Sequence, residues 1–214
     1  MRSAPFSLEC APRDTAPFES AAGAKPRLGI HWCAVRLAVC LGVMTSPGFA
    51  SAQSSLVPTG VFLQWGSAGS THAASVGTWW GWGKEWALAG GTLSGYWEGS
   101  LSAWSYPGMD GRRTSWLGQL GLVPVFRYRP EGPWSKWFGE LGIGLTLTTT
   151  VYETQGKRFS TSFNFGDHVA IGRSYGSSDQ HELALRAQHF SNAGIRQPNP
   201  GLNFVQLRYS YTFP

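Results

Sequence analysis

The chain is short of charge, cysteine and long hydrophobic runs. Only 14% of its 214 residues are charged, whereas a typical soluble domain carries about 25%. No cysteine follows Cys40, so most of the chain has neither disulfides nor thiol chemistry. Apart from a short run near the start, no stretch approaches the roughly 20 apolar residues of a membrane-spanning helix. Together these shortages exclude a helical membrane protein and argue against a coiled coil or a helical bundle.

Residues 1–52 have the features of a leader with a signal peptide. Residues 33–43 are mostly apolar, and Ala50-Ser51-Ala52 is the small-x-small pattern that precedes a cleavage site. Basic side chains precede or interrupt the apolar run, at Lys25, Arg27 and Arg36. We expect cleavage between Ala52 and Gln53, which leaves residues 53–214 as one exported domain.

The exported part has a mild positive charge. It carries 12 Lys and Arg against 9 Asp and Glu, a net charge of +3. A nucleic-acid-binding domain would show a concentrated basic face, so no nucleic acid partner is expected. Glycine and tryptophan are abundant instead, with 28 and 11 residues in the whole chain. An aromatic, glycine-rich and charge-poor composition points towards β-structure.

Apolar and polar side chains alternate with a period of two along residues 53–214. In the carboxyl-terminal segment the odd positions from Val205 to Phe213 are apolar or aromatic, and the even positions are polar. Successive side chains of a strand point to opposite faces, so this segment is predicted to be a strand with one apolar face. The pattern recurs clearly in 116–128, 139–147 and 183–191, and more weakly in 58–66, 73–82, 95–105 and 162–171. The chain is therefore predicted to be all-β, with eight antiparallel strands.

A soluble β-sandwich and a transmembrane β-barrel both fit such strands. The barrel is favoured because one strand face is apolar and the other is polar or glycine, as expected with lipid outside and a polar lumen. The last strand is aromatic up to Phe213, although Pro214 follows. Tryptophans also lie near predicted strand ends, where a membrane interface would hold them: Trp79, Trp80, Trp82, Trp97, Trp104, Trp116, Trp134 and Trp137. We predict an eight-stranded antiparallel transmembrane β-barrel in the outer membrane of a Gram-negative bacterium.

Barrel closure with both termini periplasmic puts four loops outside, near 67–72, 106–114, 152–161 and 192–202. Three of these loops carry five basic side chains: Arg112, Arg113, Lys157, Arg158 and Arg196. Ordinary loop solubility explains them. Contact with an anionic lipid headgroup explains them equally well, because Arg matches phosphate through paired hydrogen bonds.

Residues 189–203 read His-Phe-Ser-Asn-Ala-Gly-Ile-Arg-Gln-Pro-Asn-Pro-Gly-Leu-Asn. The His-x-Ser-Asn-Ala-Gly run followed by Pro-Asn-Pro-Gly resembles the signature of the PagL family of lipid A 3-O-deacylases. The resemblance implies an eight-stranded outer membrane barrel that hydrolyses the ester-linked 3-hydroxyacyl chain at position 3 of lipid A. It implies lipopolysaccharide as substrate, outer membrane lipids as surroundings, and no cofactor.

The positions of His189 and Ser191 indicate a catalytic pair independently of the family resemblance. They lie two residues apart, so in a strand they share a face, and their parity is that of Leu183 and Leu185 on the apolar side. A polar side chain that faces lipid costs free energy, so such a residue tends to have a function. A serine hydroxyl becomes a nucleophile when a neighbouring imidazole takes its proton. We predict His189 and Ser191 as base and nucleophile, with Asn192 and the backbone N–H near Gly194 as oxyanion donors.

The third catalytic position departs from the family pattern. The family carries a Glu some twelve residues after the Ser, and the count from Ser191 reaches Asn203. Asn203 shares the parity of Val205, so it is predicted to face outward on the strand beside His189. No Asp or Glu follows Glu182 in the sequence. Three expectations stay open: a slower enzyme, an enzyme in which Asn203 orients the imidazole, or an inactive homologue.

The other candidates have structural explanations. His181-Glu182 opens a zinc motif, but Leu185 stands where the second His belongs, so no metal site is predicted. Asp167 and His168 are adjacent in a strand, so one of them faces lipid unless a bulge intervenes. The pair is expected to serve a hydrogen-bond network in the lumen, with catalysis as the alternative role. Buried ion pairs are expected there for Glu140, Glu182 and Arg186. A non-catalytic structural or adhesion barrel is the remaining rival, and a homodimer is compatible with either function.

Overall fold

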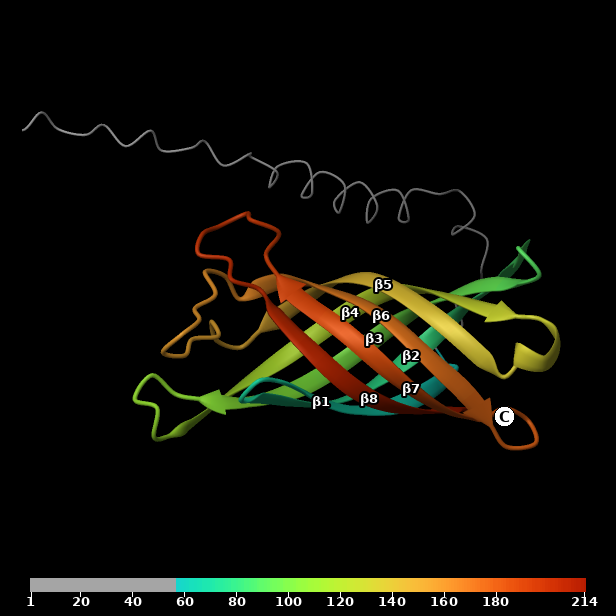
Figure 1. The fold of residues 1–214 in the computed structure, drawn as a ribbon, viewed down its shortest axis with the longest axis horizontal. Helices are drawn as coiled ribbons and strands as arrows, with labels where there is room; N and C mark the ends of the chain where they lie inside the picture. The colour runs from blue at the N-terminus through green and yellow to red at the C-terminus, as the bar shows by residue number, and fades with distance from the viewer. Residues whose placement is uncertain (1–56) are drawn as a thin grey trace, which may run out of the picture.

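The structure, a computed structural model, describes residues 57–214 (Figure 1). The predicted leader and its cleavage site lie outside the described residues. Eight strands follow one another: β1 (Gly60–Ala68), β2 (Thr71–Leu88), β3 (Gly91–Pro107), β4 (Thr114–Pro130), β5 (Trp137–Thr148), β6 (Phe163–Tyr175), β7 (His181–Ser191) and β8 (Leu202–Thr212). Between β4 and β5 lies a short 3-10 helix, η2 (Gly132–Trp134). Within residues 57–214 no helix is long and apolar enough to cross a membrane.

The eight strands close into one barrel. Each strand pairs antiparallel with the next, and β1 pairs with β8. The predicted all-β, eight-stranded antiparallel barrel is therefore confirmed, and closure excludes the two-sheet sandwich. The strands β2 and β3 extend beyond their predicted ranges. Glycine and tryptophan obscure the period-two pattern there, and the register shifts between Gly81 and Glu85.

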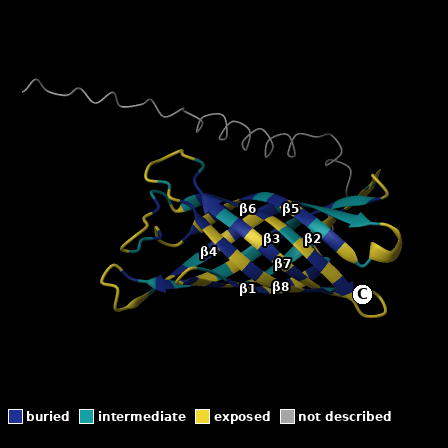
Figure 2. Ribbon diagram, in the orientation of Figure 1, coloured by how far each residue is buried: buried dark blue, intermediate teal, exposed yellow. Residues whose placement is uncertain are grey.

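The alternation of burial along each strand gives the barrel its two surfaces. On β7 the outward Leu183 and Leu185 are exposed, whereas Glu182 and Arg186 are buried in the lumen. Figure 2 shows the same checkerboard of buried and exposed residues over the barrel wall. Large apolar side chains therefore cover the outside, as a wall in contact with lipid requires.

Charged side chains fill the middle of the lumen. Arg186 places its two terminal nitrogens 3.0 Å from the two oxygens of Glu98, and Arg208 lies 2.5 Å from the same carboxylate. Arg127 lies 2.6 Å from Glu140. Opposite charges thus compensate each other among buried side chains. Lumenal ion pairs are present for all three predicted side chains, Glu140, Glu182 and Arg186.

An aromatic cluster fills the lumen beside the longer loops. Trp104 lies 4.9 Å from Phe190 and 4.8 Å from Phe204 between ring centroids. Tyr152 of the β5–β6 loop joins the cluster and shares a 2.7 Å hydrogen bond with Thr71. This end of the barrel is therefore packed with side chains, and β7 and β8 each contribute to the packing.

The structure corrects two of the predicted interfacial tryptophans. Trp104 is 1% exposed and lies among the lumenal aromatic residues. Trp79 packs against Tyr96, which is buried in the lumen. Both positions have lumenal parity on their strands, so neither ring lies in an outer girdle. Nearness to a strand end indicated depth in the membrane but not which face the ring occupies.

We expect Glu98→Gln to destabilise the barrel by about 3 to 5 kcal/mol, because it leaves Arg208 buried without its carboxylate. Asp179→Asn is the matched control, since the Lys136–Asp179 pair is exposed and such a pair contributes less than about 1 kcal/mol. Urea unfolding in detergent micelles measures both changes. Equal effects of the two variants would contradict a stabilising role for the lumenal network.

Candidate active site

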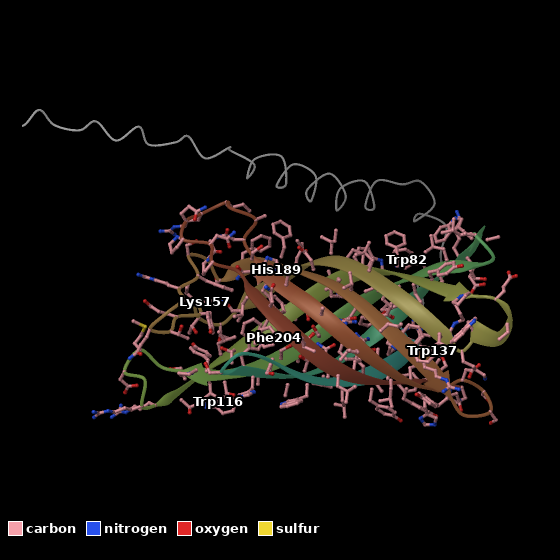
Figure 3. All side chains as sticks on the ribbon, in the orientation of Figure 1. Trp82, Trp116, Trp137, Lys157, His189 and Phe204 are labelled. Carbon is pink, nitrogen blue, oxygen red and sulfur yellow. The ribbon has the colours of Figure 1, made fainter. Side chains whose placement is uncertain are left out.

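His189 lies near the outer-loop end of β7, between two polar neighbours on the adjacent strands. Its register partner on β8 is Asn203, and its register partner on β6 is Asp167. All three positions have the outward parity of their strands. Figure 3 shows His189 at the same end of the barrel as Lys157, with Trp82 and Trp137 at the opposite end. The three strands therefore bring a polar row onto a lipid-facing wall.

The imidazole of His189 is oriented by Asn203. The Nδ1 of His189 lies 2.5 Å from the Oδ1 of Asn203. An amide oxygen only accepts hydrogen bonds, so Nδ1 carries the proton and Nε2 presents its lone pair. The predicted outward placement of Asn203 beside His189 is confirmed. This arrangement leaves Nε2 as the nitrogen able to take a proton.

Gly201 gives the imidazole its space. A Cβ at position 201 would lie 2.7 Å from the Cε1 of His189, and the backbone there has a φ of +65°. Both features demand glycine, because other residues rarely adopt this conformation and a methyl group would displace the ring. The glycine of the Pro-Asn-Pro-Gly run thus packs directly against the candidate base.

Ser191 continues the face of His189 to the end of β7. It lies two residues further along the strand and pairs in register with Phe165 of β6. The residue is 4% exposed. The chain then turns sharply, with positive φ at Ala193 and Gly194. The hydroxyl is therefore held at the junction between a strand and a tight loop.

Asn192 organises the loop that follows Ser191. Its side-chain Nδ2 donates to the hydroxyl of Ser160 at 2.9 Å and to the carbonyl oxygen of Arg196 at 2.8 Å. Its Oδ1 accepts from the backbone N–H of Gly194 at 2.9 Å. The side chain is buried. These bonds tie the β7–β8 loop to the β5–β6 loop.

The predicted oxyanion donors are already engaged in hydrogen bonds. The side-chain N–H groups of Asn192 and the backbone N–H of Gly194 already donate within the loops. Their oxyanion role stays a prediction, and it requires these bonds to be released. Asn199, which sequence reasoning missed, accepts from the backbone N–H of Asn192 at 3.0 Å. Its place in the Pro-Asn-Pro-Gly run was the available signal.

The basic loop residues lie at the same end as His189 but differ in their surroundings. The Nζ of Lys157 donates to the carbonyl oxygen of Gly201 at 3.3 Å, so it lies next to the residue that packs on the imidazole. Arg158 lies 3.4 Å from Glu153. Arg196 is tied to the β5–β6 loop through its backbone, because its carbonyl oxygen accepts from the hydroxyl of Ser160. Lys157 is therefore the cation most directly joined to the site.

Arg112 and Arg113 belong to the β3–β4 loop. The backbone N–H groups of Arg113 and Arg112 donate to Asp110 and hold the pKa of its carboxyl below the usual value. The Nε of Arg113 lies 3.8 Å from Asp110, and its side chain is 90% exposed. This pair of guanidinium groups faces solvent rather than the imidazole.

A cleft of about 590 Å³ opens among the outer loops. Thr71, Gln155 and Lys157 contribute polar groups to its lining, and Asn203 borders it. The cleft therefore adjoins the residue that orients His189. Among the described residues no group of three or more His, Cys, Asp or Glu side chains is placed to hold a metal ion.

The closed barrel and its outward polar row define an outer membrane β-barrel enzyme. A family model described as lipid A 3-O-deacylase (PagL) matches residues 70–212. The chain therefore belongs to the PagL family of lipid A 3-O-deacylases, as the signature in residues 189–203 predicted.

Individual relatives agree with the family assignment. The chain is 38% identical to the lipid A deacylase PagL of Bordetella bronchiseptica over 112 residues, which span 51% of this chain and 58% of that relative. It is 31% identical to the lipid A deacylase PagL of Pseudomonas aeruginosa over 170 residues, 79% of this chain and 92% of that relative. A crystal structure of the outer membrane enzyme PagL matches with a TM-score of 0.61 at 28% identity, over 72% of this chain and 99% of that one. These matches confirm the predicted fold and outer membrane location.

We expect Gly201→Ala to lower the rate of ester hydrolysis about 10- to 100-fold, because small displacements of a catalytic group are costly. Gly90→Ala is the control: it also has a positive φ, of +72°, but open space around the added methyl, and lies in the β2–β3 turn. Hydrolysis in detergent micelles compares the two. A fully active Gly201→Ala variant would contradict the tight packing of Gly201 on the imidazole.

Proposed function

We propose that this chain is a lipid A 3-O-deacylase that works by a Ser191–His189 mechanism at the outer leaflet. The observation that carries the proposal is the Nδ1 hydrogen bond of His189 to Asn203, which directs Nε2 away from β8. The outward parity of His189 and Ser191 supports a lipid substrate, because that face of the barrel contacts lipid. The family model, described as lipid A 3-O-deacylase, supports the particular ester. The two relatives named lipid A deacylase support lipid A as the substrate.

The chemistry proceeds in two halves. The Oγ of Ser191 attacks the carbonyl carbon of the 3-linked acyl ester, and its proton passes to Nε2 of His189. The imidazolium then returns the proton to the leaving sugar oxygen, which frees lipid A lacking one chain. Water, activated by the same imidazole, releases a 3-hydroxy fatty acid and restores the serine.

The β7–β8 loop supplies the oxyanion donors in this proposal. Asn192 and the backbone N–H of Gly194 follow Ser191 directly, and one such donor typically contributes about 3 kcal/mol to transition-state stabilisation. Positive φ at Ala193 and Gly194 makes a tight turn soon after the serine. Substrate entry would exchange the bond between Gly194 and Asn192 for one to the oxyanion.

In this proposal the outer loops bind the anionic headgroup of the substrate. Lys157 lies on the cleft beside Asn203 and donates to a carbonyl oxygen that a phosphate oxygen can replace as acceptor. Arg112, Arg113, Arg158 and Arg196 lie on the same end of the barrel and add positive potential. Cationic side chains bind phosphate through charge-assisted hydrogen bonds.

We expect Ser191→Ala and His189→Ala each to lower deacylation by at least about 1,000-fold. The chain is produced in a Gram-negative host, and mass spectrometry of its lipid A reports the loss of one hydroxyacyl chain. Ser177→Ala is the control, because Ser177 is an exposed serine in the β6–β7 turn at the other end of the barrel. Unaltered lipid A in cells with the folded parent chain would favour the non-catalytic barrel or an inactive homologue.

We expect Lys157→Ala to raise the KM for lipid A roughly 5- to 10-fold with little change in kcat, because it removes a headgroup contact outside the reacting atoms. Lys84→Ala removes an equal charge near the opposite end of β2 and is the control. Initial rates at varied lipid A concentration in micelles separate KM from kcat. An unchanged KM in Lys157→Ala would remove Lys157 from the headgroup site.

A further inference from the structure

His189 has a carboxylate neighbour that the catalytic motif does not contain. Asp167 of β6 stands directly opposite His189 in the antiparallel register. Side chains paired in this way have Cβ atoms about 4.5 to 5.5 Å apart. Asn203 takes the corresponding place on the other side, in β8. The imidazole is therefore flanked by an amide on one strand and a carboxylate on the other.

The position of Asp167 is unusual for a strand in a lipid-facing wall. Its outward neighbours two and four residues along β6, Val169 and Ile171, are both more than half exposed and apolar. An ionisable side chain in such a wall is costly and tends to have a function. His168, the next residue, points into the lumen and is buried. Asp167 is therefore the member of the Asp167-His168 pair that faces outward, and only His168 can serve a lumenal network.

A negative charge beside His189 would favour the proposed reaction. When His189 takes the proton of Ser191, the ring becomes a cation. Asn203 orients the ring through Nδ1 but carries no charge, so it cannot stabilise the imidazolium by Coulomb attraction. A carboxylate near a fixed imidazolium does so strongly where water is scarce.

We propose that Asp167 is a positioning residue for deacylation, supplying the negative charge that Asn203 lacks. The inference rests on the proposed function. It divides two tasks between two residues: one orients the imidazole, and the other stabilises its positive charge. Asn203 fixes the tautomer, and Asp167 stabilises the imidazolium. The proton moves only between Ser191, His189 and the leaving oxygen, and Asp167 takes no part in the transfer.

The first test compares carboxylate-to-amide variants. Asp167→Asn lowers kcat for lipid A deacylation about 10- to 100-fold with KM within about twofold, because the charge acts in the transition state. Asp167→Glu recovers part of the loss. Asp179→Asn, which removes a carboxylate from the β6–β7 turn at the other end of the barrel, leaves both constants unchanged. The heat-dependent migration of each barrel on gels shows that it is folded.

The second test asks whether Asp167 compensates for Asn203. Asn203→Glu places a carboxylate on the other flank of His189 and is expected to raise kcat. In that background Asp167→Asn lowers kcat at most about threefold. The two positions therefore show strong coupling in a double-mutant cycle. A structural role for Asp167 predicts instead the same loss in both backgrounds.

The outcomes separate the two proposals. Full activity of Asp167→Asn, with Ser191→Ala inactive, overturns the role of Asp167 and leaves the deacylase standing. Equal losses for Asp167→Asn in the parent chain and in the Asn203→Glu background overturn the compensation. An inactive but folded parent chain overturns the function itself, and the role of Asp167 with it.

Discussion

A closed antiparallel sheet allows each strand residue only two environments, and the position of the site follows from that constraint. Even positions of β7, such as Arg186, enter a lumen where carboxylates meet them. Odd positions, such as Leu185, face outward and are exposed. His189 is an odd position near the end of the strand, so its imidazole lies on the outside of the wall. The lumenal ion pairs and aromatic residues pack that wall from the inside, so the imidazole lies on a wall with a filled interior.

The outer loops supply the remaining contacts around His189 and Ser191. Gly201 leaves room for the imidazole ring, and Asn192 ties the loop after Ser191 to the loop between β5 and β6. Lys157 joins the same structure through the carbonyl oxygen of Gly201. The basic cleft and the candidate catalytic pair thus share one hydrogen-bonded framework. Gly201 is therefore the residue that Lys157 and the candidate base both contact.

Much of this arrangement could be predicted from the sequence, because period-two alternation states which face each side chain takes. The eight strands and the outward His189 followed from parity. The place of Asn203 beside it followed from parity and from the spacing of the family signature. Trp104 was assigned to the wrong surface, because nearness to a strand end was used in place of parity. Asp167 was missed as a neighbour of His189 because only register across β6 and β7 brings them together. The sequence alone does not fix register between strands joined by a turn of uncertain length.

The claim that an outward imidazole activates an outward serine is tested most directly by covalent labelling in a bilayer. The barrel is reconstituted in lipid nanodiscs, and a serine-reactive phosphonate with a long acyl chain is delivered from the lipid phase. Peptide mass spectrometry then locates the adduct. We predict a single adduct on Ser191 that disappears in His189→Ala. Labelling at another serine, or equal labelling of Ser191 without His189, would contradict the mechanism.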